Sequence, residues 1–264
     1  MKRKSQNITR SKKNSPYSRL IPVSAIAALL VIWQVVCMLG LVPEFMLPSP
    51  AGVVKAFAGD FPLLMSHLWI SLAEAFLGLG LGILIGFLAA VLMDSFEVCY
   101  KAFYPIIVIT QTIPTIAIAP LLVLWMGYDI APKVTLIVIV TFFPIAVGLL
   151  EGFRSADEDA MRLLRAMGAG RWQIFRYVKL PGALSSFFAS LRISVSYSVV
   201  GAVIAEWLGG YKGLGVYMTR VRSAYAFDKM FAVIFLISAI SLALMGCVTL
   251  IRKKCMPWER VSRK

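Results

Sequence analysis

The chain has 264 residues, of which 59% are hydrophobic and only 15% are charged. Soluble globular domains have about 45–50% apolar and about 25% charged residues, so this composition excludes an ordinary soluble domain and favours a membrane protein. The formal net charge is +14, which in a soluble chain would suggest a nucleic-acid partner. In a membrane protein it is first interpreted as a signal of topology, and no nucleic-acid partner is predicted.

Apolar segments of about 20 residues match the hydrocarbon thickness of a bilayer. Six such segments predict an all-α membrane protein, a polytopic bundle of about six transmembrane helices: 20–41, 70–93, 103–126, 133–150, 186–208 and 230–251. They form one transmembrane domain, 20–251, between two basic tails, 1–19 and 252–264.

The first segment follows a basic tail, a pattern that also opens secretory signal peptides. Its apolar run is longer than the usual signal-peptide core, and no small-x-small cleavage site follows before Pro43. We therefore expect a retained membrane anchor.

The distribution of Lys and Arg predicts the orientation of the bundle. One side of the six segments carries 20 of these residues, the other side carries six, and Arg192 lies within the fifth segment. Because cytoplasmic loops are enriched in Lys and Arg, both termini and the loop 151–185 are assigned to the cytoplasm.

Glycines recur every four residues in the second segment, at Gly78, Gly82 and Gly86. This spacing puts them on one helix face, where they allow a second helix to approach closely. A nucleotide-binding loop would need GxGxxG spacing after a strand, which this segment lacks, so we predict a helix-packing role.

The third segment contains three prolines, at Pro105, Pro114 and Pro120. Each removes a backbone donor, and the freed carbonyls persist at membrane depth only inside protein or beside a wet cavity. Polar residues flank the breaks: Thr110, Gln111, Thr112 and Thr115. Together with Pro114 they are candidates for a substrate path, although the hydroxyls could equally serve to satisfy the kinked backbone.

Two acidic residues, Glu74 and Glu206, lie near the predicted outer ends of the second and fifth segments. A carboxylate in the bilayer is unfavourable by about 2.5 kcal/mol or more, so we expect interfacial placement, with a role on the substrate path as the alternative for Glu206. The glycines of 209–215 predict a flexible outer turn after it.

The loop 151–185 is the longest connection of the predicted cytoplasmic side. Acidic residues at 157–159 cap a first short helix, Gly168 and Gly170 end it, and a second helix follows until Pro181 ends that one. Two short helices joined by a glycine turn predict a compact docking element.

The four cysteines show no CxxC pair and His67 is the single histidine, so no metal site and no catalytic residue is predicted.

The stretch 164–192 resembles the cytoplasmic signature loop of permease subunits of binding-protein-dependent ABC importers. In that signature a glycine is followed, after nine residues, by an Ile-x-Leu-Pro group; here Gly168 is followed at that spacing by Val178-Lys179-Leu180-Pro181. The acidic-Ala-Ala triplet of many members is replaced by Arg162-Leu163-Leu164, so its contacts do not carry over. The segments LPSP, QTIPTIAIAPLLVLWMGYDIAPK and AEWLGGYKGLGVYM are similar to the nitrate, sulfonate, taurine and thiamine-precursor branch.

The resemblance implies a type I importer permease that pairs with a second copy of itself, two cytoplasmic ATPase subunits and an external substrate-binding protein. A coupling helix around 165–173 would contact the ATPase, and the residues implied are Arg162, Arg165, Gly168, Ala169, Arg171, Trp172, Arg176, Leu180 and Pro181. Alternatively, the arginines only satisfy the positive-inside rule. The chain has no GxxxxGK[ST] motif, so ATP and Mg²⁺ are expected on the partner, with no cofactor and no enzymatic activity here.

The transported molecule is predicted less directly. The segment after residue 215 is similar to permeases for pyrimidine thiamine precursors or other vitamin precursors, with sulfonate, taurine or nitrate as the alternative within the branch. An anion path should have a positive lining, and Arg192 is the one cation away from the ends of the predicted segments. An ion-coupled secondary transporter would need inverted repeats and midplane acids, and a membrane hydrolase would need a clustered nucleophile and base.

Overall fold

The computed structural model describes residues 17–43 and 45–260. Most of the predicted tail 1–19 and the end of the predicted tail 252–264 therefore lie outside the described residues. Within them every regular element is helical. The α-helices are α1 (Tyr17–Met38), α2 (Pro50–Gly59), α3 (Phe61–Ser95), α4 (Glu97–Thr110), α5 (Thr115–Met126), α6 (Ile130–Arg154), α7 (Glu158–Ala166), α8 (Arg171–Ile174), α9 (Leu180–Gly209), α10 (Leu214–Ser223) and α11 (Phe227–Cys255).

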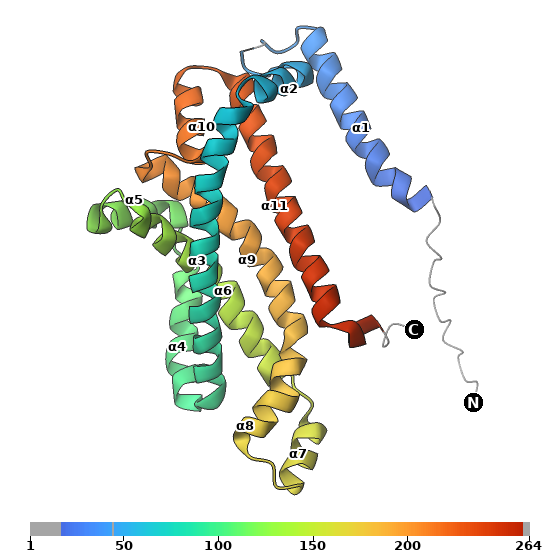
Figure 1. The fold of residues 1–264 in the computed structure, drawn as a ribbon, viewed down its shortest axis with the longest axis vertical. Coiled ribbons are helices and arrows are strands. Elements are labelled where there is room, and N and C mark those ends of the chain that lie inside the picture. Colours follow the sequence, from blue (N-terminus) through green and yellow to red (C-terminus); the bar gives the residue numbers. More distant parts are fainter. Residues whose placement is uncertain (1–16, 44, 261–264) are drawn as a thin grey trace, which may run out of the picture.

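The centre of the bundle consists of α3, α6 and α9, which run side by side (Figure 1). The glycines of α3 face α6: a Cβ at Gly86 would lie 2.9 Å from Ile145, and Cβ atoms at Gly78 and Gly82 would overlap Ile137 and Thr141. Lipid supplies no hydrophobic force between helices, so close backbone contact through small residues is what holds such helices together.

The same principle joins α6 to α9. A Cβ at Gly152 would lie 2.7 Å from the Cβ of Ala183, and one at Gly148 would overlap Ser190. Ser194 on α9 donates a hydrogen bond of 3.1 Å to the carbonyl of Thr141. α6 therefore packs tightly against a neighbour on two faces.

Among the described residues, four helices are long and apolar enough to cross a membrane: Phe61–Ser95, Ile130–Arg154, the combined helix Arg171–Gly209, and Phe227–Cys255. The predicted segment 103–126 is not a single helix. It falls on α4 and α5, which meet at an angle of 98°. Pro114, at the break, cannot donate a helical hydrogen bond and disfavours helical geometry in the residue before it, so the chain turns there.

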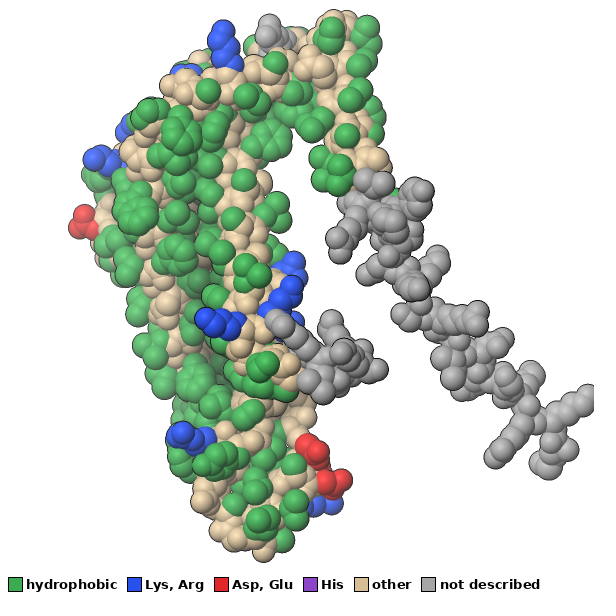
Figure 2. Space-filling view, turned by 45° about the vertical axis from the view of Figure 1, so that its right-hand side comes forward, with side chains coloured by type: hydrophobic (Ala, Val, Ile, Leu, Met, Phe, Trp, Pro, Cys, Tyr) green, Lys and Arg blue, Asp and Glu red, His purple; other side chains and the backbone are tan. Residues whose placement is uncertain are grey.

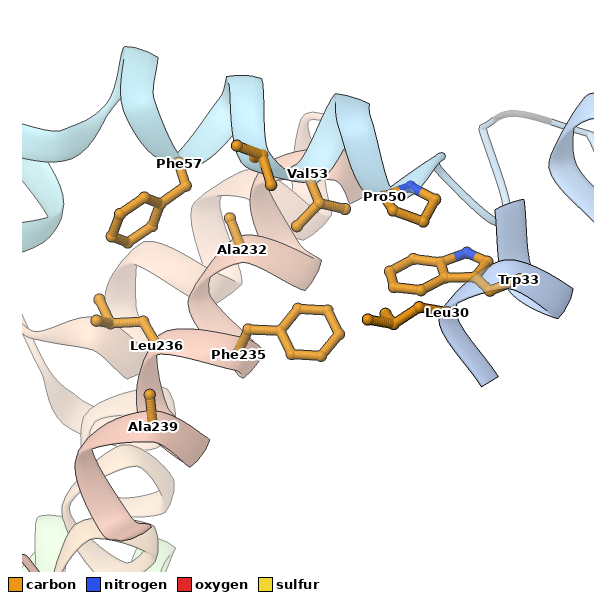
Figure 3. Close-up of a pocket in the computed structure, with 10 residues that line it drawn as sticks. Leu30, Trp33, Pro50, Val53, Phe57, Ala232, Phe235, Leu236 and Ala239 are labelled. Atoms are coloured by element: carbon orange, nitrogen blue, oxygen red, sulfur yellow. The ribbon is translucent and has the colours of Figure 1, made fainter. Parts of the chain in front are cut away.

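Hydrophobic side chains cover most of the face drawn in Figure 2, whereas Lys and Arg side chains are few and lie near its top, near its lower end and in a group about halfway down. α1 and α11 diverge from a common region beneath α2 (Figure 1). Between these three helices lies an apolar groove of about 380 Å³, in which Trp33 stacks on Phe235 with 5.8 Å between ring centroids (Figure 3). The indole nitrogen of Trp33 donates to the carbonyl of Pro48 at 3.1 Å, which fixes α1 at its upper end.

Candidate functional site

A helical knob, defined as Asp157–Lys179, extends beyond one end of the bundle (Figure 1). Asp157 caps α7, since its Oδ1 accepts hydrogen bonds from the backbone of Asp159 at 2.9 Å and of Ala160 at 3.3 Å. α7 ends at Ala166, and Gly168 shortly after it has φ +85°. The backbone N–H of Ala169 donates to the carbonyl of Leu164 at 2.9 Å. Glycine adopts this left-handed geometry without strain, which explains the residue at the tip.

The sequence pattern predicted that the second helix of the knob ends at Pro181, but in the structure this helix continues past the proline. Arg171–Gly209 is one continuous helix of 39 residues, with a π-helical segment at Phe175–Lys179 directly before the proline. A wider turn accommodates a residue that lacks an N–H and whose ring would clash with the preceding turn, so the helix continues through it. The knob is thus rigidly joined to the membrane helix α9.

Two contacts fix the base of the knob. Lys179 Nζ lies 2.8 Å from both carboxylate oxygens of Asp94 at the end of α3. Phe175 contacts Phe153 of α6 with 5.2 Å between ring centroids. Leu180 packs against the core formed by α3, α6 and α9, whereas Pro181 is exposed.

The arginines predicted to contact an ATPase fall into two groups. Arg162 is paired along α7 with Glu158 at 3.0 Å. Arg165, Arg171 and Arg176 are exposed and form no ion pair with any residue that the structure describes. Apolar side chains are exposed beside them: Leu163, Met167, Trp172 and Tyr177. The knob therefore presents unpaired cations and apolar surface together, a combination typical of a protein contact site.

A second candidate site lies at the break between α4 and α5. A cavity of about 200 Å³ is lined there by Gln111, Thr115 and Tyr197 among apolar residues of α6 and α9, and no charged residue lines it. Gly201 leaves room beside α6, because a Cβ there would lie 3.2 Å from Val140. The amide and hydroxyl groups suit an uncharged ligand with hydrogen-bonding edges.

The other predicted path residues do not line this cavity. The hydroxyls of Thr110 and Thr112 donate to carbonyls one turn earlier, to Ile107 at 2.6 Å and Ile109 at 2.8 Å. These two residues thus satisfy the broken backbone, the alternative that the sequence left open. Pro114 occupies the N-cap position of α5.

Glu206 does not line this cavity; it is 1% exposed, near the C-terminal end of α9. Its Oε1 accepts from Ser71 at 2.6 Å and its Oε2 accepts from the backbone of Gly215 at 2.6 Å. Ser71 in turn accepts from the backbone of Leu214 at 2.8 Å, and His67 Nδ1 accepts from Gly213 at 2.9 Å. The turn predicted to be flexible is instead tied to α3 and α9, because the first donors of α10 need acceptors.

Glu74 is also buried within the bundle. It pairs with Lys133 of α6, a residue that the topology count placed outside, at 2.6 Å, and the two side chains are 4% and 8% exposed. We call His67, Ser71, Glu74, Lys133 and Glu206 the outer polar network. The spacing of His67, Ser71, Glu74 and Gly78 marks one face of α3 and is the sequence signal that could have revealed it.

A second polar contact lies at the same end, outside the apolar helices. Asp60 accepts from Tyr217 at 2.6 Å and pairs with Lys229 at 2.8 Å. Hydrogen bonds from Lys229 and Tyr217 lower the pKa of the Asp60 carboxyl below its ordinary value. The same carboxylate, together with burial, raises the pKa of Tyr217.

An apolar bundle with a small uncharged cavity at a broken membrane helix, and with a rigid knob at one end, defines a membrane transport permease. The comparisons with known proteins identify which kind.

The chain belongs to the family of binding-protein-dependent transport system inner membrane components, which matches residues 82–256. A probable ABC transporter permease protein of Haemophilus influenzae is 37% identical over 85% of this chain and 92% of that protein. The formylaminopyrimidine transport permease protein ThiX of Halalkalibacterium halodurans is 36% identical over 92% of this chain and 98% of that protein. A chain of the methionine ABC transporter MetNI, in an inward facing conformation, has the same fold with a TM-score of 0.66 at 21% identity, covering 74% of this chain and 97% of that one.

These findings confirm the family resemblance drawn from the sequence and the type I importer permease fold. The protein is a multi-pass membrane permease of the ABC class and a transport subunit rather than an enzyme. As a family member, it works with ATPase and binding-protein partners.

Proposed function

We propose that two copies of this chain form the membrane path of an ATP-driven importer, and that the knob of each copy docks on one of two cytoplasmic ATPase subunits. The observation that carries this is the continuous helix Arg171–Gly209. It contains the exposed Arg171 and Trp172 at one end and the cavity residues Tyr197 and Gly201 farther along. A displacement of the knob therefore moves a wall of the cavity.

The contact with the ATPase uses the residues that the knob exposes. Arg165, Arg171 and Arg176 offer unpaired guanidinium groups, which suit carboxylates at a partner surface. Trp172 is 67% exposed and Met167 is 73% exposed, and both would be covered in a complex. Gly168 and Ala169 lie in the turn at the tip, between α7 and α8. ATP and Mg²⁺ bind to the ATPase in this proposal, and the permease supplies no cofactor site.

The second copy covers α5. This short helix projects from the bundle (Figure 1), and Ile116, Leu121, Leu124 and Trp125 on it are exposed. Apolar surface of this kind is compatible with lipid, but the adjacent cavity is open and partly polar, and a second copy would close it into a path.

Both chain termini and the knob lie on the cytoplasmic side of the inner membrane in this arrangement, and an external binding protein delivers the solute to the opposite end.

The solute that fits the cavity is small and uncharged. Gln111, Thr115 and Tyr197 supply donors and acceptors among apolar walls, which suits a heterocycle such as the pyrimidine named for the Halalkalibacterium relative. A sulfonate, taurine or nitrate path should present a cation, and Arg192 is exposed and does not line the cavity. We therefore favour a pyrimidine thiamine precursor or a related vitamin precursor.

The coupling role is tested in vesicles that contain the permease, its ATPase and its binding protein. Gly168→Val puts a β-branched residue at φ +85° and should distort the tip. We expect ATPase association to weaken by about tenfold, roughly 1.4 kcal/mol, with a matching loss of ATP-dependent uptake.

Gly40→Val is the matched control, because Gly40 also has a positive φ, of +63°, and open space around it, far from the knob. The control should associate and transport normally. Unchanged association and uptake in Gly168→Val would contradict the coupling role, and uptake without any ATPase would establish the ion-coupled alternative instead.

A further inference from the structure

Exposed cations gather around α10, at the end of the bundle away from the knob (Figure 1). Two other cations of this end, Lys133 and Lys229, pair with carboxylates of the chain. The cations around α10 are exposed and form no ion pair with any residue that the structure describes: Lys212, Arg220 and Arg222. The enrichment of Lys and Arg on the cytoplasmic side accounts for cations at the knob end, but it does not account for these.

Two exposed tyrosines flank α10. Tyr211 and Tyr225 are 73% and 77% exposed, and Arg220 Nη2 donates to the carbonyl of Tyr211 at 3.1 Å. Tyr225 has φ +55°, a geometry in which glycine is the favoured residue. The backbone thus gives no reason for a large aromatic side chain at this position. We call Tyr211, Lys212, Arg220, Arg222 and Tyr225 the outer patch.

The fold holds the outer patch rigidly. The first backbone donors of α10 bind to three side chains of the outer polar network: Gly213 to His67, Leu214 to Ser71 and Gly215 to Glu206. Tyr217 of α10 donates to Asp60 at 2.6 Å, and the helix packs on α3, α9 and α11. A surface that is fixed before binding loses little conformational freedom when a partner binds.

The chemistry of the outer patch fits an acidic protein surface. Lys and Arg side chains that lack a counter-charge suit carboxylates across an interface, and Tyr and Arg are enriched at protein contacts. A second copy of this chain that met the patch with its own would bring like charges together, which is unfavourable. The solute cavity is lined by other residues and carries no charge, so the patch is not part of the solute site.

We propose that the outer patch is the docking surface for the external binding protein, and that this protein presents a carboxylate-rich surface to it. The patch is joined through Glu206 to α9, the helix that also carries the cavity residues Tyr197 and Gly201. Docking would therefore act on the cavity wall from the end opposite to the knob. The inference rests on the proposed function in taking this end of the bundle as external; it does not require that the knob contact an ATPase.

The test uses the full chain, purified in nanodiscs of phosphatidylcholine without its ATPase, and the purified binding protein of the same importer. Both ends of the bundle are open to solution in a nanodisc, so neither the orientation in the cell nor a failure of coupling affects the result. Association is titrated by biolayer interferometry. We expect it to weaken at least about tenfold between roughly 50 mM and roughly 500 mM salt, because salt screens charge pairs at an exposed interface.

The variant K212Q/R222Q should weaken association at low salt by about tenfold and should lose part of the salt dependence. Its matched control is K101Q/K254Q, which removes two exposed cations elsewhere on the chain and should bind as the unchanged protein does. Y225G removes the exposed ring at a position where glycine suits the backbone, so it should weaken association without lowering thermal stability. This variant keeps the test decisive if the double variant folds poorly.

Unchanged association of K212Q/R222Q or of Y225G, equal losses in the two double variants, or association that does not depend on salt would overturn the proposal. A shift in the proportion of permease dimers in K212Q/R222Q, measured by mass photometry, with unchanged association of the binding protein, would show that the patch faces a second copy instead. If the docking test fails while Gly168→Val still abolishes coupled uptake, the docking surface is wrong and the coupling role stands.

Discussion

The continuous helix Arg171–Gly209 has different chemistry at its two ends. At the end away from the knob Glu206 is buried, and both of its oxygens accept hydrogen bonds from within the chain. At the knob end Arg165 and Arg171 are exposed without ion pairs among the described residues. Glu206 at the first end is thus satisfied by the fold itself, whereas Arg165 and Arg171 at the second end are available to another molecule.

The comparison teaches which substitutions should affect stability and which should affect partners. A buried charge that loses its counter-charge destabilises the fold strongly, because it stays away from water. An exposed, unpaired charge contributes little to the fold. Three substitutions test this difference between charges that stabilise the fold and charges that are available to partners, in order of decreasing expected effect on stability.

The largest effect is expected for Lys133→Met. Lys133 lies 2.6 Å from Glu74 Oε1, and the other oxygen of Glu74 is buried without a hydrogen-bond partner within the described chain. Removing the cation should lower the free energy of unfolding by about 3–5 kcal/mol. SDS-induced unfolding in mixed micelles measures it.

The double variant Lys133→Met/Glu74→Met is the control, because it replaces both charges with apolar groups of similar volume. It should recover most of the loss. If the double variant is as unstable as the single one, the side-chain volume of Lys133 matters and its charge does not, and the outer polar network is not held by this ion pair.

The two ends also differ in how far the sequence predicted them. The fold of the knob depends on residues that are close in sequence. Asp157 and Gly168 lie at the two ends of one short helix, so the rules for helix capping apply directly. The outer polar network joins Ser71 to Leu214 and His67 to Gly213, pairs separated by 143 and 146 residues. No local pattern encodes such pairs, so the acids were expected at an interface and the glycine turn was expected to be flexible.

Local rules also failed where tertiary packing overrode them. Pro181 is a helix terminator by propensity, but the preceding π-helical segment and the packing of Leu180 in the core carry the helix past it. The glycine spacing of α3 predicted a close helix contact, and the structure identifies α6 as the neighbour. Which helix faces which could not be predicted, since periodicity gives a face and not its partner.

An intermediate effect, dependent on pH, is expected at Asp60, which lies at the outer end but outside the apolar helices. Its pKa is lowered in the folded protein, mainly by the hydrogen bond from Lys229 and then by that from Tyr217. A depressed carboxyl pKa stabilises the fold above the unfolded value, near 3.8, and this stabilisation is lost as the pH falls through the folded pKa.

Asp60→Asn should therefore lower stability at pH 7 by about 0.5–1 kcal/mol, the range of a partly exposed pair, and should lower it less at pH 3. Unfolding curves at the two pH values measure the difference. Asp129→Asn is the control, since Asp129 is exposed and outside any ion pair of the described residues. An equal deficit at both pH values in Asp60→Asn would show that the carboxylate charge is not what stabilises this contact.

The smallest effect on stability is expected for Arg171→Gln, at the knob end of the continuous helix Arg171–Gly209. Arg171 is exposed and makes no ion pair within the described chain, so its loss should change the free energy of unfolding by less than about 0.5 kcal/mol. The same variant should weaken ATPase association in the vesicle assay. Lys101→Gln, 75% exposed and paired only at 3.8 Å with Glu97, removes the same charge on the same side and should change neither quantity. A stability loss in Arg171→Gln comparable with that of Lys133→Met would mean that the knob end, too, is held by its charges, and the contrast between the two ends of α9 would disappear.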